Sequence, residues 1–435
     1  MAPRCADDDG ADGGDGSDAA LPRTRASPER MGEWCRGAAA PILTPVTKTC
    51  PACDGADLRP VIDLGRLPAN GTRPFPTRAA ALAEPAGRVR LVACGTCGFV
   101  FNAAFDPALV HVGPDLEETQ AASPAFVRLQ HDLARDMVAR HGLAGGRILE
   151  IGCGKGEFLA LLAETAGGSG EGFDPAFVPG RAGPGEARIR VHRRFFDAAD
   201  AAAARADVVV CRMTLEHAAD PARLVDLARD AATATGATVI FTVPEALHLL
   251  RAGNPFEAHH EHAGYFTPGS LARLFRRRGL TVTDIRILHG GQCLLIDARP
   301  GGTGGATLPV EEPPDATLAA AMGFAAAAAR TIDRWRARIA GWRAAGGGVV
   351  LWGAGSRATT LVNLLQAGPE VSAVVDANPR RDGTFVAGTG HPVVAPHRLP
   401  TLRPRLAVVL NPVYRDEVGG MLAGVGLGST AVETA

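Results

Sequence analysis

RILEIGCGKGEF, residues 147–158, is the stretch that decides the fold of this chain. Its apolar first half predicts a buried strand, with Glu150 near the end of that strand. Gly152, Gly154 and Gly156 predict a tight turn into a helix. Their spacing is GxGxG, which differs from the GxGxxG of a dinucleotide loop. Because Glu150 would repel a pyrophosphate at the start of the helix, the loop favours a cationic cofactor.

S-adenosylmethionine is such a cation, since it carries a sulfonium and a charged amino group. In the next expected strand, the sequence GFDPAF places Asp174 where nucleotide-binding folds hold an acid for the ribose hydroxyls. The residues therefore predict an S-adenosylmethionine site made by Glu150, Gly152, Gly154, Gly156 and Asp174. The plainer alternative is that Glu150 only caps the loop and Asp174 only begins a turn.

The chain around this loop alternates between strand-like and helix-like patterns. Expected strands cover residues 147–151, 171–174, 189–196, 207–212, 238–243, 280–288 and 292–298, and expected helices cover 123–140, 158–165, 221–232 and 268–278. The alternation predicts an α/β fold with a Rossmann-like, doubly wound, seven-stranded sheet. The last two strands are too close together for a crossover helix, so we expect them to form a hairpin.

Two cysteine pairs, Cys50-Pro-Ala-Cys53 and Cys94-Gly-Thr-Cys97, precede this sheet. Each CxxC predicts a tight turn that brings two thiolates together, which suits a tetrahedral four-sulfur zinc site. Four cysteine ligands leave no open position on the metal, so such a site would be structural. The alternative is two unrelated pairs of free thiols, or a redox pair.

Charge and hydropathy exclude some classes of partner. The 45 Lys and Arg residues nearly balance the 46 Asp and Glu residues, and no basic block stands out, which argues against nucleic acid and acidic membranes. No apolar run approaches the ~18 residues of a membrane-spanning helix, and the first residues lack the apolar core of a signal peptide. We therefore expect a cytoplasmic protein, monomer or homodimer, that acts on a small molecule.

Three stretches of the chain carry a resemblance to a known class of enzyme. ILEIGCGKGEF (148–158), VVVCRMTLEHAADP (208–221) and HAGYFTPGSLARLF (262–275) resemble the core of class I S-adenosylmethionine-dependent methyltransferases. Glu216 and His217 lie in the second stretch, at the end of the fourth expected strand. The resemblance implies that these two side chains face the cofactor, although either could equally be structural.

The flanking regions narrow the resemblance to the zinc-containing sugar C-methyltransferases. TCPACDGADLRPVIDLGRLPAN (49–70) and the second CxxC pair are similar to the zinc-binding lobe of that family. WGAGSRATTLVNLL (352–365) and VVDANPRRDGTFVAGTGHPVVAP (374–396) are similar to its C-terminal domain. The family usually methylates a nucleotide-linked keto-deoxysugar at the carbon next to the ketone. The resemblance thus implies deoxysugar chemistry in secondary-metabolite, for instance antibiotic, or polysaccharide biosynthesis.

Together these patterns predict six segments along the chain. They are a disordered acidic and Gly-rich tail (1–45), a zinc-binding lobe (46–115), a methyltransferase core (120–298), a linker (299–316), a C-terminal Rossmann-like substrate domain (317–418) and a Gly-rich tail (419–435). An Ala-rich helix over 318–345 opens the C-terminal domain, and strands are expected there at 349–352, 371–375 and 406–410.

The run AHHEH, residues 258–262, is the candidate catalytic cluster. Carbon methylation needs a base to remove a weakly acidic proton beside a carbonyl, and imidazole titrates near neutrality. The resemblance implies that His262 is this base, with Glu261 beside it, and that His259 stands where the family commonly has Tyr. A second Tyr of the family has no counterpart here. The alternatives are a solvated charged loop, or a metal site made by His259, Glu261 and His217.

The resemblance also implies substrate contacts from His289, in a stretch similar to the family's HGG element, and from Arg357 and Asn363 in the C-terminal domain. The HGG could equally be a plain hairpin turn. Three rival functions stay open. They are an O- or N-methyltransferase of a secondary metabolite, an oxidoreductase using the glycine loop at Gly353, and a zinc-ribbon adaptor with a vestigial enzyme core.

Overall fold

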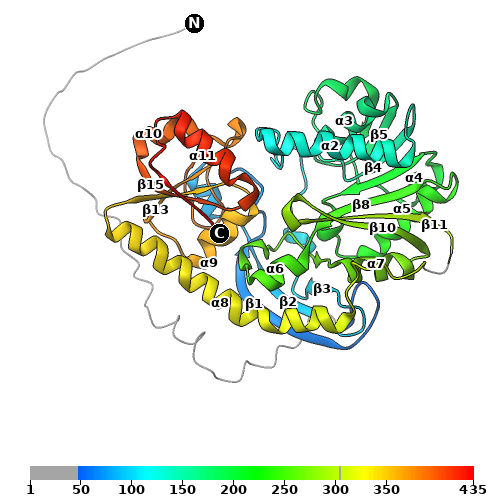
Figure 1. The fold of residues 1–435 in the computed structure, drawn as a ribbon, viewed down its shortest axis with the longest axis horizontal. Helices are drawn as coiled ribbons and strands as arrows, with labels where there is room; N and C mark the ends of the chain where they lie inside the picture. Colours follow the sequence, from blue (N-terminus) through cyan, green and yellow to red (C-terminus); the bar gives the residue numbers. More distant parts are fainter. Residues whose placement is uncertain (1–47, 303–304) are drawn as a thin grey trace, which may run out of the picture. The chain divides into compact units, whose positions relative to one another are not determined.

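The computed structural model describes residues 48–302 and 305–435, so the predicted tail at 1–45 lies outside the described residues. Its central feature is a seven-stranded sheet with the order β10-β11-β8-β7-β4-β5-β6 (Figure 1). The strands are β4 (Arg147–Ile151), β5 (Ser169–Phe173), β6 (Ile189–His192), β7 (Val208–Arg212), β8 (Thr238–Pro244), β10 (Leu280–Leu288) and β11 (Cys293–Pro300). The predicted doubly wound sheet is confirmed, and β10 and β11 form the expected antiparallel hairpin.

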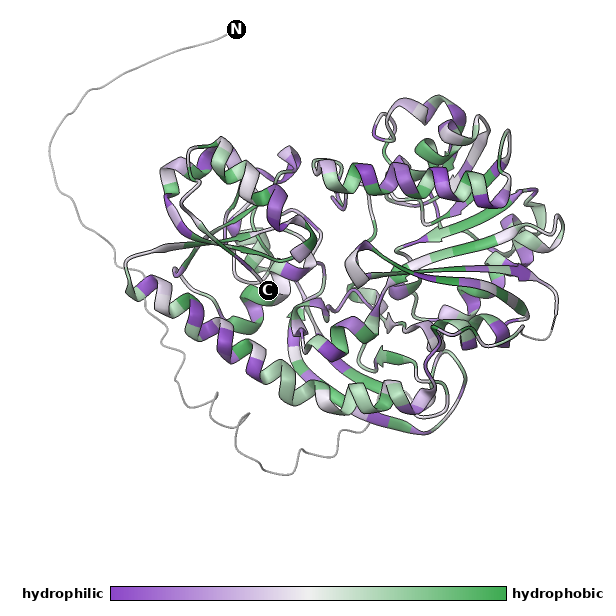
Figure 2. Ribbon diagram, viewed as in Figure 1, coloured by the Kyte–Doolittle hydropathy of each residue, from purple (hydrophilic) through white to green (hydrophobic). Residues whose placement is uncertain are grey.

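Alternate residues of these strands face two different hydrophobic layers, as the period of two requires. Ile148 packs with α2 (Pro124–His141) and α3 (Glu157–Ala166). Leu149 packs on the opposite face with α5 (Pro221–Thr233) and α7 (Pro268–Arg277). Figure 2 shows the hydrophobic residues concentrated along these strands. Short helices α4 (Ala198–Ala203) and α6 (Ala246–Ala252) complete the connections.

The lobe that carries the cysteine pairs contains a four-stranded antiparallel sheet with the order β1-β2-β3-β9. Its strands are β1 (Leu58–Pro68), β2 (Ala86–Cys94), β3 (Val100–Asn102) and β9 (Gly264–Tyr265), with α1 (Arg78–Leu82) between the first two. The fourth strand comes from the core, directly after the AHHEH run. The predicted lobe boundary of 46–115 therefore misses a strand, because two residues paired over a long sequence separation leave no periodic signal.

The C-terminal domain contains a five-stranded parallel sheet with the order β14-β13-β12-β15-β16. Its strands are β12 (Gly348–Trp352), β13 (Val371–Val375), β14 (Val393–Val394), β15 (Pro404–Val409) and β16 (Ala431–Thr434), and its helices are α8 (Pro314–Ala344), α9 (Ser356–Leu365), α10 (Leu399–Leu402) and α11 (Arg415–Gly424). Helix α8 contacts β1 and α6 as well as β12, so it connects this sheet to the lobe and the core (Figure 1).

Two predicted boundaries are wrong. Residues 419–435 are not a Gly-rich tail, since they hold the end of α11 and the edge strand β16, which pairs with β15. The glycines there suit a helix end and a turn, and Gly426 has a positive φ of 78°. The linker predicted at 299–316 is shorter, because β11 runs to Pro300 and α8 begins at Pro314. In the described part of the chain, no helix is long and apolar enough to cross a bilayer.

The edge strand gives a stability test of this correction. Val432 in β16 packs against the hydrophobic layer around Trp352 and Val409, whereas Thr434 of the same strand is exposed. We expect Val432→Asp to lower the free energy of unfolding by about 1–3 kcal/mol, since it places a charge against an apolar layer. Thr434→Asp is the matched control and should change it little. Equal effects of the two substitutions in chemical denaturation would mean that β16 does not pack on the sheet.

Candidate functional site

A cavity of about 1630 Å³ opens at the carboxyl ends of β4, β5, β7 and β8, where α/β sheets bind their ligands. Segments of the lobe and of the C-terminal domain also line it. The structure brings most of the predicted site residues to this cavity: Glu150, Gly152, Gly154, Asp174, Glu216, His217, His259, Glu261, His262, His289 and Arg357. Most of the predicted cofactor, catalytic and substrate residues thus share one cavity.

Two predicted residues are not among those that line the cavity. Gly156 begins α3 with a φ of 80°, and a Cβ there would lie 3.1–3.2 Å from the side chains of Ile189, Ala182 and Phe177. Gly156 therefore allows the turn into α3 and the close packing of the side chains around that turn. Asn363 donates from Nδ2 to the carbonyl oxygens of Thr359 (2.7 Å) and Ala387 (3.0 Å), which fixes it within the C-terminal domain.

The glycine loop requires its glycines for two reasons. Gly152 and Gly154 have φ values of 73° and 54°, in the left-handed region that favours glycine. A Cβ on Gly152 would also lie 2.3 Å from Oγ1 of Thr214. Asp174 holds the loop from the neighbouring strand, because its Oδ2 accepts from the backbone N–H of Gly154 at 2.8 Å and its Oδ1 accepts from that of Ala176 at 2.7 Å.

Glu150 is a buried acid at the end of β4. It is 3% exposed, and its Oε2 has no hydrogen-bond partner among the described residues. Burial raises its pKa to about 7 and Asp174 adds to the shift, whereas the positive charge of Arg212 opposes it. Arg212 is also held by the Phe158 ring, with 3.6 Å from the guanidinium carbon to the ring centroid. A cationic ligand in the cavity would favour the ionised form of Glu150.

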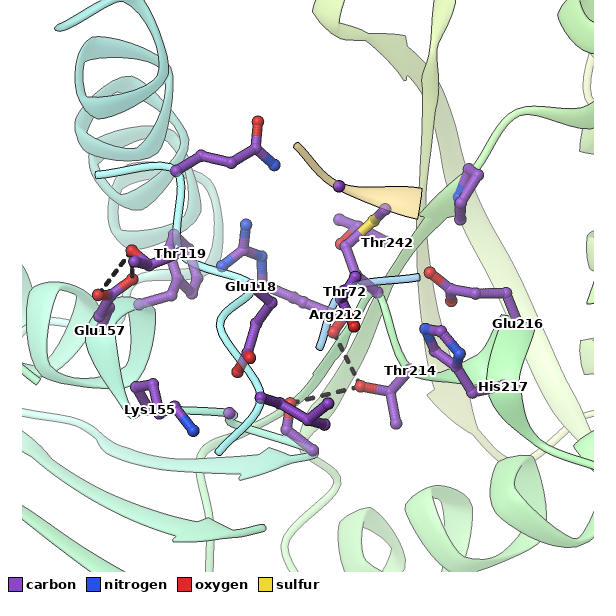
Figure 3. A pocket seen from close by; sticks show the side chains of 18 of the residues that line it. Thr72, Glu118, Thr119, Lys155, Glu157, Arg212, Thr214, Glu216, His217 and Thr242 are labelled. Atoms are coloured by element: carbon purple, nitrogen blue, oxygen red, sulfur yellow. Dashed lines mark hydrogen bonds between the residues drawn. The ribbon is translucent and has the colours of Figure 1, made fainter. Parts of the chain in front are cut away.

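The wall next to the glycine loop includes residues to which no sequence pattern assigned a role. Lys155 is 3% exposed and donates from Nζ to the carbonyl oxygens of Pro114 (3.2 Å) and Ala176 (2.7 Å). Glu118 lines the same part of the cavity, and a Cβ on Gly154 would lie 2.9 Å from its Oε1 (Figure 3). Lys155 stands inside the quoted glycine motif, whereas Glu118 lies in a loop without any motif or period.

The histidines of the AHHEH run point to different places. His260 is fully buried, and its ring would collide with a Cβ on Gly87 of β2, at 2.2 Å. His259 and His262 line the cavity with ring centroids 5.0 Å apart. Burial lowers the pKa of His259 to about 3 and that of His262 well below its ordinary value, and Arg357 and His217 contribute to both shifts. Both imidazoles are therefore neutral at neutral pH.

Glu261 connects three parts of the chain. Its Oε1 accepts from the backbone N–H (3.3 Å) and the hydroxyl (3.2 Å) of Thr72 in the lobe. Its Oε2 accepts from the hydroxyl of Ser356 at the start of α9, at 2.7 Å. Its backbone oxygen lies 2.9 Å from Nδ1 of His217. These contacts make Glu261 a residue that positions the neighbouring His262.

Glu216 and His217 lie in a short 3₁₀ turn, Leu215–His217, that follows β7. Glu216 is 1% exposed, neither of its carboxylate oxygens has a hydrogen-bond partner among the described residues, and burial raises its pKa to about 7. Figure 3 shows its carboxylate beside the His217 ring. The side-chain ligand atoms of Glu216, His217 and His262 lie within 4.8 Å of one another. This grouping differs from the rival metal set of His259, Glu261 and His217.

The C-terminal domain contributes Arg357 to the cavity wall. Its guanidinium donates to Oε1 of Gln292 (2.9 Å) and to the carbonyl oxygen of Leu410 (3.1 Å), and lies 3.2 Å from Oε2 of Glu257. His289 lies in the His289–Gly291 turn of the β10–β11 hairpin, and its Nε2 is 3.5 Å from the hydroxyl of Tyr414. The HGG element is thus a hairpin turn, and its His289 also lines the cavity.

The four cysteines of the lobe form one buried cluster. Sγ of Cys50 lies 3.7 Å from Sγ of Cys97, and Sγ of Cys53 lies 3.6 Å from Sγ of Cys94. All four sulfurs are within 4.8 Å of one another. Tetrahedral ligation with Zn–S bonds of about 2.3 Å places sulfurs about 3.8 Å apart, so the cluster has the dimensions of a zinc site.

Arginines of α7 hold both cysteine turns from the core. Arg273 donates from Nε to the carbonyl oxygen of Cys97 at 2.9 Å, and Arg277 donates to that of Cys53 at 3.0 Å. Each CxxC turn therefore has a hydrogen bond to the core in addition to its contact with the other turn. These two contacts could not be predicted from the sequence. The pattern of a helix shows which of its side chains face outward, but not which loop those side chains contact.

Comparison with known proteins gives two family matches. Residues 125–285 match a family described as a methyltransferase domain, and residues 315–426 match one described as the C-methyltransferase C-terminal domain. The ubiquinone biosynthesis O-methyltransferase of Aromatoleum aromaticum is 30% identical over 171 residues, which are 35% of this chain and 72% of that protein. The protein of the same name from Aeromonas salmonicida is 29% identical over 163 residues, 34% of this chain and 68% of its own.

Among solved structures, the 1,6-didemethyltoxoflavin-N1-methyltransferase of Burkholderia thailandensis is similar to part of this chain. The sequence identity is 17% and the TM-score is 0.31. The match covers 40% of this chain and 79% of the other.

Proposed function

This chain belongs to the S-adenosylmethionine-dependent methyltransferases, and from that premise we propose that it methylates carbon on a nucleotide-linked keto-deoxysugar or a related small keto compound. One observation carries the proposal. In the cavity next to the glycine loop, His262 is a neutral imidazole beside a domain that matches the C-terminal domain of C-methyltransferases. A carbon acid needs such a base, whereas many oxygen nucleophiles do not.

The cofactor would lie against the glycine loop. Gly152 and Gly154 leave room for it, Asp174 offers its carboxylate to the ribose hydroxyls, and Glu150 offers a negative charge to the cation. When bound, S-adenosylmethionine supplies an electrophilic methyl group. The residues of the chain bind it, orient it toward His262 and exclude water from the closed part of the cavity.

The keto substrate would lie between His262 and the C-terminal domain. Arg357 and His289 are the groups there that suit a nucleotide phosphate or a sugar hydroxyl. Burial depresses the pKa of His262. The ring therefore stays unprotonated, in the form that a base must have, throughout the neutral pH range. Glu261 keeps the loop of the base fixed through Thr72 and Ser356.

An O-methyltransferase is the second candidate. It is favoured by the names of the relatives from Aromatoleum aromaticum and Aeromonas salmonicida, and by the absence of the family's tyrosines from the expected positions. Those relatives match only 35% and 34% of this chain, so their names leave most of it without a counterpart. The position of the transferred methyl group in the product separates the two candidates.

A structural zinc ion in the four-cysteine cluster is also part of the proposal. Cys50, Cys53, Cys94 and Cys97 would hold it as thiolates, and the small lobe would depend on it for stability. The sulfur separations of 3.6 and 3.7 Å support the assignment.

The first prediction concerns the cofactor. Asp174→Ala removes the expected ribose contacts and also the acceptor for the Gly154 amide, so S-adenosylmethionine binding should weaken by about 1–3 kcal/mol. Asp132→Ala, on the exposed face of α2, is the control and should leave binding unchanged. Calorimetry that finds equal affinities for the two variants would remove Asp174 from the site.

The second prediction concerns the metal. Protein purified without chelator should contain one zinc ion per chain, and Cys94→Ser should lose it and unfold at a lower temperature. Cys293→Ser changes a cysteine outside the cluster and should keep the metal. A metal-free wild type with four titratable thiols in the lobe and normal stability would contradict the zinc assignment.

The third prediction concerns the base. His262→Ala should lower turnover by ~10²–10⁴-fold while the cofactor still binds, because the variant lacks the group that takes the proton from carbon. His259→Ala should cost less, since Nδ1 of that ring is engaged with the hydroxyl of Thr360 at 2.8 Å. The wild type should also exchange the substrate's α-proton with deuterated water when S-adenosylhomocysteine replaces the cofactor. Near-normal turnover by His262→Ala, or a methyl group on oxygen, would favour the O-methyltransferase.

A further inference from the structure

The proposed reaction needs a hydrogen-bond donor as well as a base. Removing a proton beside a ketone places negative charge on the ketone oxygen, and a donor fixed at that oxygen stabilises it. The chain has two tyrosines. The hydroxyl of Tyr265 donates to the carbonyl oxygen of His259 (3.1 Å), and that of Tyr414 donates to Oε1 of Gln120 (2.9 Å). Both tyrosine protons are therefore already used within the protein.

His217 is not suited to donate a hydrogen bond to the ketone oxygen either. Its Nδ1 lies 2.9 Å from the backbone oxygen of Glu261. A neutral ring must carry its proton on Nδ1 to make that hydrogen bond, which leaves Nε2 as an acceptor. Arg357 is engaged with Gln292, the carbonyl oxygen of Leu410 and Glu257. A donor can instead come from another group that lies close to His262.

Glu216 is that group. Its side chain lines the cavity, is 1% exposed, and has two oxygens without a hydrogen-bond partner among the described residues. A buried carboxyl group without partners is costly as an anion, and it needs a ligand or a proton. Its oxygens and the ring nitrogens of His217 and His262 lie within 4.8 Å of one another. A base and an acid this close together can reach adjacent atoms of one substrate.

We propose that the carboxyl group of Glu216, as its neutral acid, donates the hydrogen bond that stabilises the enolate oxygen while His262 takes the proton from carbon. The inference rests on the proposed C-methylation and assigns Glu216 a catalytic role in it. It replaces the sequence-based expectation that Glu216 contacts the cofactor.

The reaction has two steps, proton removal from carbon and then methyl transfer to that carbon. A ring nitrogen of His262 takes the α-proton, the C–H electron pair becomes the carbon–carbon π bond, and the carbonyl π pair moves to the oxygen that Glu216 hydrogen-bonds. In the second step the carbonyl re-forms and the nucleophilic carbon bonds to the methyl group. The methyl–sulfur bond breaks with its electron pair on sulfur, and His262 releases its proton to solvent.

The surroundings of Glu216 agree with a protonated state. Burial raises its pKa to about 7, and His217 opposes the shift only when its ring is protonated. The other titratable groups that face it are His262 and the thiols of Cys211 and Cys293; the pKa values of both thiols are raised by burial. A carboxyl group kept neutral in an apolar site can act as a hydrogen-bond donor. Since its pKa is raised, the acid is present below about pH 7 and is lost as the pH rises.

Two substitutions test the role. Glu216→Gln keeps a donor that does not titrate, whereas Glu216→Leu has none. The probe is thymidine diphosphate 4-keto-6-deoxyglucose with S-adenosylhomocysteine, and the readout is α-proton exchange with deuterated water. We expect Glu216→Leu to lose about 10²–10³-fold in exchange rate with unchanged S-adenosylmethionine affinity. We expect Glu216→Gln to retain most of the rate and to lose the decline in rate above pH 7. Glu171→Gln, at an exposed position of β5, is the control.

A second measurement does not need a substrate. The infrared difference spectrum between the wild type and Glu216→Gln should contain the carbonyl band of a buried carboxylic acid below pH 7. The band should fade as the pH rises through that value. Its absence on the acid side would overturn the inference.

Other outcomes identify different roles. If Glu216→Leu weakens S-adenosylmethionine binding, Glu216 is a cofactor contact. If chelators abolish exchange and Co²⁺ gives a ligand-field spectrum in the wild type but not in Glu216→Gln, then Glu216, His217 and His262 hold a cation. Either result overturns the inference while C-methylation stands. A methyl group on oxygen, or a wild type that exchanges no α-proton with any keto probe, contradicts the proposed function itself.

Discussion

The carboxylate of Glu261 is the contact on which the arrangement of the site depends. It accepts hydrogen bonds from Thr72 of the lobe and from Ser356 of the C-terminal domain, and it belongs to the same loop as His262. A buried carboxylate is tolerated only with such partners. Because the partners come from both sides, the lobe, the core and the C-terminal domain must all be in place before the loop of His262 has a fixed position.

The regular part of the fold could be predicted from the sequence because its signals are local. Strand β10 is found at the expected residues 280–288, and α2 begins after Ser123, whose side chain accepts from the backbone N–H of Phe126. Strands β9, β14 and β16 could not be predicted in the same way. The first two contain two residues each, too few for a period to be visible. The third stands among glycines that are typical of a loop.

The residues of the site can be separated in the same way, into those with a local sequence signal and those without one. Glu150, Asp174 and Glu216 stand at strand ends or shortly after them, and the topology of a doubly wound sheet brings strand ends together. Glu118 and Arg357 reach the cavity from separate segments, and Arg357 could be indicated only by resemblance. Asn363 shows the limit of that resemblance, since its amide is used by Thr359 and Ala387 of its own domain. Sequence patterns indicate which residues lie near the carboxyl-end edge of a sheet. They do not show which of those side chains are already hydrogen-bonded within the protein.

The pairing of β3 with β9 has a consequence for synthesis on the ribosome. Val100 and Phe101 of β3 pair with Tyr265 and Gly264, which are made only after strands β4 to β8 of the core. Until then, β3 is an open edge of the nascent lobe, with hydrogen-bonding groups available to any other chain. The lobe is made before the core but completes its sheet only after β9 is made, so its β3 edge stays open to wrong pairing during synthesis.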